Sequence, residues 1–279
     1  MTGDFSLLLP VYAGNSAKEL QEAFESSVHR QTLRPDVVVV VEDGPLGEEL
    51  DVTLDGLAST SPAPVTRVRL ERNQGLASAL NAGLSASTTE FVARMDADDV
   101  SVHDRFARQL PVIRERGLDV LGGALAEFHD SVDAIDVLRV PPVGEVDIRR
   151  SVPFRQPFNH PTVVMRRSTV LAVGGYPTDM GRFEDYVLFA RLIAQGAAVD
   201  NLPDTVLYYR ADGGAYHRRG GWRHFLSEVG LQRELRRIGI TSRTQWLRNV
   251  LLRGPYRLVP VGVRARAYRQ FATRPAGDR

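Results

Sequence analysis

Acidic side chains crowd one short stretch of the chain, Arg94-Met95-Asp96-Ala97-Asp98-Asp99, directly after the apolar run Phe91-Val92-Ala93. Neighbouring carboxylates repel one another, so this arrangement is costly unless a cation neutralises it. Oxygen ligands without His or Cys suit Mg²⁺ or Mn²⁺, and such an ion usually bridges protein carboxylates to substrate phosphates. An EF-hand loop fits poorly, because Ser101 stands where that loop needs Gly. The stretch indicates a metal-assisted phosphate site or a solvated acidic turn, and a DxD triplet alone would favour the turn.

A second acidic group, Glu42-Asp43-Gly44, follows the consecutive valines 37–41. A β-branched apolar run of this kind is typical of a central parallel strand that is covered on both faces. Open α/β folds bind ligands in the crevice at the carboxyl ends of such strands. We therefore expect both acidic groups to lie at the same edge of one sheet.

The rest of the pattern predicts the α/β elements that position these groups. Ser16 and Glu19 form a capping box before a helix, and Gly174-Gly175 ends another. Residues 126–158, rich in prolines, predict a hairpin excursion and a mobile loop. We expect strands over residues 5–11, 37–41, 65–70, 90–95, 119–125 and 206–209, a return to the sheet over 160–165, and helices after Ser16, from Gly75, over 103–116, over 167–173 and from 183.

Composition limits the class of protein. The chain has 279 residues, a formal net charge of +1 and no Cys, which excludes disulfides and thiolate chemistry and is compatible with a cytoplasmic location. We find no apolar run long enough to span a bilayer and no signal peptide. A dinucleotide-dependent oxidoreductase is not expected, because no G-x-G-x-x-G follows a strand. A sugar-1-phosphate nucleotidyltransferase remains an alternative, although residues 10–16 contain only Gly14 where its glycine-rich loop should lie.

Five motifs occur in a fixed order along the chain. They are Leu8-Leu9-Pro10-Val11-Tyr12, Glu42-Asp43-Gly44, the run from Asn73 to Gly83, Asp96-Ala97-Asp98-Asp99, and Gly174-Gly175-Tyr176 with Glu184-Asp185. Together they resemble the family 2 glycosyltransferases, which are inverting, nucleotide-sugar-dependent enzymes of GT-A fold. The resemblance covers about residues 5–210, and it is the ordered set, rather than any one motif, that is specific.

The resemblance implies a nucleotide-sugar site. Asp43 corresponds to the acid that holds the nucleotide base, although a turn or capping Asp before Gly44 is the structural alternative. Asp96 resembles the acid that contacts the ribose or sugar, and Asp98 the ligand of Mn²⁺ or Mg²⁺ on the diphosphate of a UDP-, dTDP- or GDP-linked sugar. The other residues predicted to bind the sugar donor are Pro10, Val11, Tyr12, Asn73, Gly75, Asn81 and Ala97.

The resemblance also assigns the acceptor side and the catalytic carboxylates. Asp185 corresponds to the base that takes the proton of the acceptor hydroxyl, with Glu184 as its helper; the alternative is that both acids complement the helix dipole. His160 is placed to line the acceptor side or to be a buried structural His. Asp99 either touches the sugar and acceptor side or caps the following helix, and His217 either completes the metal shell or is a surface His.

The chain is expected to divide into a catalytic domain, residues 1–221, with a nucleotide-sugar half at about 1–125 and an acceptor half at about 126–221, and a helical Arg-rich extension, residues 222–279. The last forty residues carry nine Arg and one acid. Arg and aromatics beside an apolar face suit a helix lying on an anionic membrane, while a helix packed on the catalytic domain is the alternative. No nucleic-acid motif appears.

We therefore predict transfer of a single sugar, because the signature of processive synthases is absent. The expected acceptor is a glycan or a lipid-linked glycan in cell-envelope or exopolysaccharide biosynthesis. The expected location is the cytoplasm or the inner face of the plasma membrane, as a peripheral protein. A catalytically inactive, membrane-associated scaffold of the same fold is the alternative from another class of protein.

Overall fold

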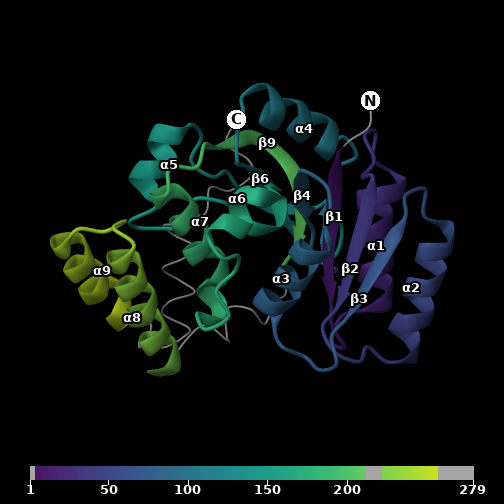
Figure 1. Ribbon diagram of the computed structural model, residues 1–279, viewed down its shortest axis with the longest axis horizontal. Coiled ribbons are helices and arrows are strands. Elements are labelled where there is room, and N and C mark those ends of the chain that lie inside the picture. The colour runs from purple at the N-terminus through teal and green to yellow at the C-terminus, as the bar shows by residue number, and fades with distance from the viewer. Residues whose placement is uncertain (1–3, 212–221, 257–279) are drawn as a thin grey trace.

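The apolar side chains of the first two strands point alternately into two separate cores, one on each face of a sheet. In β1 (Phe5–Val11), Leu7 and Leu9 lie in one core and Leu8 lies in the other. The valines of β2 (Val37–Glu42) alternate in the same way. Because successive side chains of a strand point to opposite faces, an uninterrupted apolar run requires cover on both sides. The computed structural model, which describes residues 4–211 and 222–256, shows this cover as two layers of helices (Figure 1).

The sheet has nine strands, in the order β3-β2-β1-β4-β8-β6-β9-β5, with β7 paired to β6. Its parallel part joins β1, β2, β3 (Val65–Arg69) and β4 (Phe91–Arg94). β6 (Val120–Phe128) runs parallel to β9 (Val199–Arg210) and antiparallel to β7 (Ile135–Arg139) and β8 (Val164–Arg166). The short β5 (Val100–Ser101), directly after the acidic stretch, pairs antiparallel with β9. The predicted α/β fold is confirmed.

Helices cover each face of the sheet in turn. Buried residues of α1 (Ala17–Phe24), α2 (Glu48–Thr60) and α4 (Arg105–Glu115) belong to the first core. Those of α3 (Leu76–Ala86), α5 (Glu145–Ser151), α6 (Arg167–Ala172) and α7 (Glu184–Ala194) belong to the second. Three short helical segments are of other types: η1 (Glu25–His29) is a π-helix, and η2 (His160–Thr162) and η3 (Gly181–Phe183) are 3₁₀ helices.

Several elements differ from the predictions. Helix α2 was not predicted, although Leu50, Leu54 and Leu57 recur at helical spacing and are buried. Within residues 126–158, the predicted hairpin is confirmed as β6–β7, and α5 replaces part of the expected loop. Strand β9 begins at Val199 rather than at 206, because its first residues pair with β6. These long-range pairings are not encoded in any local periodicity.

The last described helices lie at the end of the molecule opposite α2 (Figure 1). Helix α8 (Trp222–Arg237) contacts α7, and its Leu231 and Leu235 join the second core. Helix α9 (Arg243–Tyr256) contacts α8 and is fixed by Asn249, whose amide donates to the carbonyl of Pro153 at 2.7 Å. This pair is therefore packed on the rest of the molecule through α7 and the segment at Pro153. No helix among the residues described is both long and apolar enough to cross a membrane.

Candidate functional site

The carboxyl ends of β1, β2 and β4 open onto a pocket of about 410 Å³, here termed the strand-end pocket. Of the ten residues predicted to bind the sugar donor, nine line it and Asn81 does not. The chain adds β2 and β3 on one side of β1 and β4 on the other, so the strand order reverses at β1. Open α/β sheets bind their ligands at the carboxyl ends of the strands where such a reversal occurs. The lining residues are Pro10, Val11, Tyr12, Asn15, Asp43, Asn73, Gly75, Leu76, Ala79, Arg94, Asp96, Ala97, Asp98 and Tyr209.

Asp43 holds the start of α3 in addition to lining the pocket. Its carboxylate oxygens accept the backbone N–H of Gln74 at 2.6 Å and that of Gly75 at 2.9 Å. A Cβ on Gly44 would come within 2.5 Å of the amide nitrogen of Asn73, and Gly44 has a φ of +87°, so only glycine allows this close approach. Asp43 therefore caps the start of α3, as the structural alternative expected. Each of its oxygens keeps a lone pair for a further hydrogen bond.

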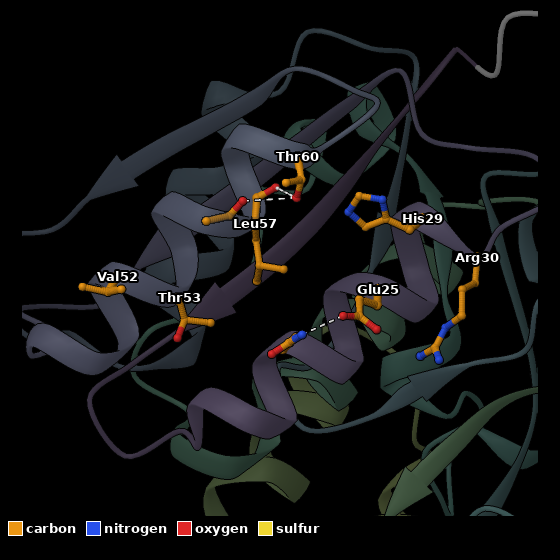
Figure 2. Close-up of a pocket in the computed structure, with 9 residues that line it drawn as sticks. Glu25, His29, Arg30, Val52, Thr53, Leu57 and Thr60 are labelled. Atoms are coloured by element: carbon orange, nitrogen blue, oxygen red, sulfur yellow. Dashed lines mark hydrogen bonds between the residues drawn. The ribbon is translucent and has the colours of Figure 1, made fainter.

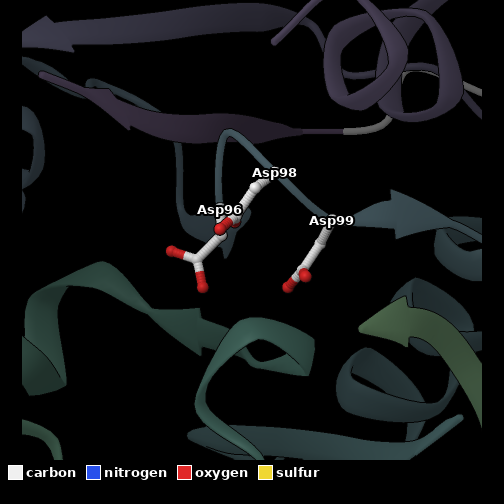
Figure 3. A group of neighbouring side chains, drawn as sticks. All are labelled: Asp96, Asp98 and Asp99. Atoms are coloured by element: carbon white, nitrogen blue, oxygen red, sulfur yellow. The ribbon is translucent and has the colours of Figure 1, made fainter. Parts of the chain in front are cut away.

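The acidic stretch forms a compact group of carboxylates. One oxygen each from Asp96, Asp98 and Asp99 can be chosen so that all lie within 4.8 Å of one another (Figure 3). Burial, and then the charge of Asp96, raises the pKa of Asp98 to about 6. The same two causes, together with the charge of Asp98, raise the pKa of Asp99 well above its usual range. A divalent cation would relieve the repulsion between these carboxylates, and carboxylate oxygens are the ligands that such a cation prefers.

Arg94 supplies a fixed positive charge beside this cluster. It is only 2 % exposed, lines the strand-end pocket and pairs with the carboxylate of Asp96. Burial alone would lower the pKa of Arg94, yet Asp96 and its neighbours raise it, so the guanidinium stays charged. Its Nε and Nη1 atoms are buried without a hydrogen-bond partner. These two nitrogens can therefore donate to an anion or a hydroxyl group in the pocket.

Asp99 is tied to the last strand rather than to the helix that follows it. Its Oδ1 accepts the backbone N–H of Arg210 at 3.0 Å, and its side chain is fully buried. Arg210 in turn donates from Nε to the carbonyl of Asp98 at 2.9 Å and from Nη2 to Glu22 at 2.6 Å. The predicted cap of α4 is wrong, because α4 begins after Asp104. The predicted ligand His217 lies outside the described residues.

The first turn of α7 carries the other pair of acids. Asp185 accepts hydrogen bonds from Gln156 Nε2 and from the amide of Tyr186, both at 2.6 Å. Burial raises the pKa of Asp185, which these bonds and the positive charge of Arg94 oppose. Burial and then the charge of Asp185 raise the pKa of Glu184 to about 7, and Glu184 Oε2 has no hydrogen-bond partner. Burial therefore favours the protonated form of both acids, and it brings the pKa of Glu184 close to neutral pH.

His160 is buried beside Tyr176 and Asp185. Its Nε2 lies 2.9 Å from the hydroxyl oxygen of Tyr176, and its Nδ1 lies 3.7 Å from Asp185 Oδ2. Burial, helped by the charge of Arg94, lowers the pKa of His160 well below its usual range, so the ring is neutral. Asn81 acts at the same place: its amide donates to the carbonyl of Tyr176 and accepts its N–H, each at 2.8 Å.

Several residues of the site were not predicted for a role, among them Arg94, Gln156 and Tyr209. Arg94 opens the acidic stretch, and its position at the end of a buried strand is the signal that could have marked it. Gln156 lies in the segment that was expected to be a loop, where no local pattern shows it. Tyr209 lines the pocket because β5 pairs with β9, a contact that only the tertiary structure reveals.

A larger hollow, of about 490 Å³, lies between α1 with η1 and α2 (Figure 2). Several of its polar side chains are engaged within their own helices: Gln21 donates to Glu25, and the Thr60 hydroxyl donates to the carbonyls of Gly56 and Leu57. It lacks the convergent charges of the strand-end pocket, and we assign no function to it.

Comparison with known proteins agrees with this geometry. The family described as "Glycosyl transferase family 2" matches residues 6–174. The chain belongs to this family. It is 36% identical over 262 residues to the amylovoran biosynthesis glycosyltransferase AmsE of Erwinia amylovora, covering 93% of this chain and 96% of that protein. It is 29% identical to the UDP-Gal:alpha-D-GlcNAc-diphosphoundecaprenol beta-1,3-galactosyltransferase of Escherichia coli, over 98% of each chain.

Solved structures of similar fold include enzymes with bound nucleotide sugars. The mannosyltransferase PcManGT of Pyrobaculum calidifontis, in complex with GDP-Man and Mn²⁺, superposes with a TM-score of 0.64 at 18% identity, covering 97% of this chain and 76% of that one. S. aureus TarS 1-349 in complex with UDP-GlcNAc gives 0.65 at 17% identity, covering 91% and 72%. At these identities the likeness establishes the GT-A fold of this family 2 glycosyltransferase.

Proposed function

We propose that this glycosyltransferase inverts the anomeric centre while it moves a single sugar from a nucleotide-sugar donor to a glycan or lipid-linked acceptor. One observation carries the proposal: acids at the end of β4 and at the start of α7 both interact electrostatically with the same buried cation, Arg94. Arg94 pairs with Asp96, and its charge opposes the rise that burial causes in the pKa values of Glu184 and Asp185. A sugar bound between these two groups would meet a phosphate-binding side and a proton-accepting side.

On the phosphate side, Asp96, Asp98 and Asp99 would hold Mg²⁺ or Mn²⁺. Their carboxylate oxygens are close enough to share one ion, and the buried Oδ2 of Asp99 has no other partner. The ion would stabilise the negative charge that develops on the departing diphosphate, which is worth several kcal/mol. The free N–H groups of Arg94 are placed to add to that stabilisation. His217 stays a predicted further ligand.

On the acceptor side, Asp185 is the proposed base. An acceptor hydroxyl attacks the anomeric carbon opposite the diphosphate, and the Asp185 carboxylate takes its proton, an effect of typically about 10²–10⁴-fold. Gln156 and the Tyr186 amide hold that carboxylate in one orientation. Glu184, the proposed helper, keeps an unpartnered oxygen that an acceptor hydroxyl could satisfy. His160 would line this side through its contact with Asp185 rather than by touching substrate.

The proposed acceptor follows from the relatives and from α9. Two of the relatives carry names from amylovoran biosynthesis and from transfer to a diphosphoundecaprenol-linked sugar. Leu247, Leu251 and Leu252 are exposed on α9, the last two by 62% and 66%, beside exposed Arg243 and Arg248. This leucine–arginine face suits the headgroup region of an anionic membrane. We therefore propose residues 222–279 as an extension that brings the catalytic domain, residues 1–221, to a lipid-linked acceptor on the cytoplasmic side.

The first experiment is a thermal-shift panel of UDP-, dTDP- and GDP-sugars, each with Mn²⁺, Mg²⁺ or EDTA. A ligand at a hundredfold excess over its Kd stabilises the folded state by about 2.7 kcal/mol, which raises Tm by roughly 5–10 °C. We expect a metal-dependent shift with one nucleotide, and its loss in Asp98→Ala. Asp104→Ala, at an acid outside the cluster, is the control and keeps the shift. Absence of any shift would favour a non-catalytic scaffold of the same fold.

The membrane contact is tested by co-sedimentation with vesicles. We expect binding to vesicles that contain phosphatidylglycerol, weaker binding to pure phosphatidylcholine, and loss of binding in Leu251→Ser/Leu252→Ser. Val52→Ser changes an equally exposed apolar side chain on α2, at the opposite end of the molecule, and serves as the control. Equal binding by Leu251→Ser/Leu252→Ser and by Val52→Ser would show that the exposed leucines of α9 do not contact the membrane.

A further inference from the structure

A series of hydrogen bonds and one close contact leads from α3, the helix beside the strand-end pocket, to Asp185. It begins at Asn81, on the helix whose start is held by Asp43. The two bonds between the Asn81 amide and the Tyr176 backbone fix the position of Tyr176. A Cβ on Gly175 would overlap Asn81 Oδ1, so glycine at 175 is what lets the two segments meet. The Tyr176 side chain is thereby anchored to α3 rather than to a loose loop.

Tyr176 then contacts His160, which faces Asp185. The phenol hydroxyl and His160 Nε2 are 2.9 Å apart, and all of this is buried. His160 also packs edge-on against Phe189 of α7, with ring centroids 5.9 Å apart, which fixes the plane of the imidazole. On its other side, His160 Nδ1 lies 3.7 Å from Asp185 Oδ2, the oxygen that Gln156 already contacts. The ring thus stands between a hydroxyl group and a carboxylate.

A neutral imidazole has one N–H, and the surroundings decide which nitrogen carries it. If Nε2 carried the proton, the lone pair of Nδ1 would face the negative Asp185 carboxylate, which is repulsive. If Nδ1 carries it, the N–H dipole points at the carboxylate, and Nε2 accepts the Tyr176 hydroxyl. The second arrangement satisfies all three groups. The 3.7 Å separation is longer than a formed bond, as is common for catalytic hydrogen bonds before substrates are bound.

We propose that Tyr176 and His160 are positioning residues for Asp185: the Tyr176 hydroxyl fixes the Nδ1–H tautomer of His160, and that N–H orients the carboxylate and favours its ionised form. This inference rests on the proposed role of Asp185 as the base. It gives the Gly174-Gly175-Tyr176 motif and Asn81 a common task, which is to link the sugar-donor side of the site to the base.

Other charged groups near Asp185 also influence its pKa. Glu184, on the same helix, disfavours ionisation of Asp185, while Arg94 of β4 favours it. Tyr176 stays protonated, because burial raises its pKa. His160 is neutral for the same reason of burial. Removal of the Nδ1–H donor therefore leaves Arg94, Gln156 and the Tyr186 amide as the groups that keep Asp185 ionised, and the apparent pKa of the base should rise.

The tautomer is measured by ¹⁵N NMR of histidine-labelled full-length protein, which requires no acceptor. The His160 signal is assigned by its disappearance in His160→Asn. We expect a neutral Nδ1–H ring that does not titrate between about pH 5.5 and 8, although free His titrates in that range. In Tyr176→Phe, which removes a single oxygen atom, we expect a shift toward the Nε2–H form. An Nε2–H tautomer in the wild type would overturn the proposal.

The effect on the base is measured as the pH dependence of kcat, with the nucleotide sugar found by thermal shift and a diphosphate-linked GlcNAc lipid as acceptor. Tyr176→Phe and His160→Phe should move the acid limb upward by about half to one pH unit, with the KM of the sugar donor unchanged. His160→Asn keeps an N–H near the position of Nδ1, so its acid limb should lie close to that of the wild type. Tyr176→Phe should have no further effect when His160 is already Phe.

The outcomes separate this inference from the proposed function. If Asp185→Asn retains wild-type transfer, Asp185 is not the base and both fail. If Asp185→Asn abolishes transfer while Tyr176→Phe and His160→Phe leave the acid limb in place, only the positioning role fails. Additive losses in the Tyr176→Phe/His160→Phe double variant would also contradict a link that runs from Tyr176 through His160.

Discussion

Glu184 should destabilise the folded protein at neutral and higher pH, so replacing it with Gln should increase stability. Its side chain is 9% exposed and lies beside Asp185, and its pKa rises from 4.5 to about 7 on folding. The folded state therefore binds this proton more tightly than the unfolded state. Stability contributed by the protonated carboxyl is complete below about pH 4.5 and is lost as the pH rises through about 7.

The magnitude follows from the size of that pKa difference. A shift of one unit corresponds to 1.36 kcal/mol, so the ionised carboxylate costs about 3 kcal/mol at roughly pH 8. At about pH 5 most of the folded-state carboxyl is protonated, and the cost falls to about 1 kcal/mol. Glu184→Gln keeps the shape of the side chain and removes the charge. We expect it to raise the free energy of unfolding by these amounts at the two pH values.

The assay is denaturant unfolding of the ligand-free protein, followed by circular dichroism at both pH values. Glu48→Gln is the matched control, because Glu48 is the first residue of α2 as Glu184 is of α7, but it is exposed. That control should lose a few tenths of a kcal/mol through the helix dipole and gain nothing. No gain for Glu184→Gln at pH 8, or the same gain at both pH values, would refute the reasoning. We also expect the stabilised variant to transfer sugar more slowly.

Two further predictions concern the backbone of the site. Asp43→Ala removes two charge-assisted hydrogen bonds to the amides at the start of α3, and we expect a loss of about 2–4 kcal/mol in unfolding free energy together with the nucleotide-induced thermal shift. Gly175→Ala should lower Tm more than Gly174→Ala: both have positive φ, which costs about 1 kcal/mol, but only the former would overlap Asn81. Equal Tm losses would contradict the close packing at Gly175.

Much of the strand-end pocket could be predicted from sequence because it is built from short-range features. The valine run before Asp43 and the apolar run before Asp96 identify two parallel strands, and the carboxyl ends of such strands share one edge. Nine of the ten predicted residues accordingly line one pocket. Asn81 was the exception: it belongs to the motif, but its helical position turns its amide to the Tyr176 backbone.

The surroundings of the acids were decided by the tertiary structure alone. Asp99 is buried because β5 pairs with β9, which brings in the Arg210 amide from 111 residues away. Asp185 meets Gln156 and His160 only after the segment from Gln156 to His160 packs against α7. Desolvation and orientation depend on which distant segments pack around a side chain, and no periodicity records that. The sequence by itself thus determined which acids come to the carboxyl edge of the sheet, and tertiary packing decided the burial, the hydrogen-bond partners and the orientation of their side chains.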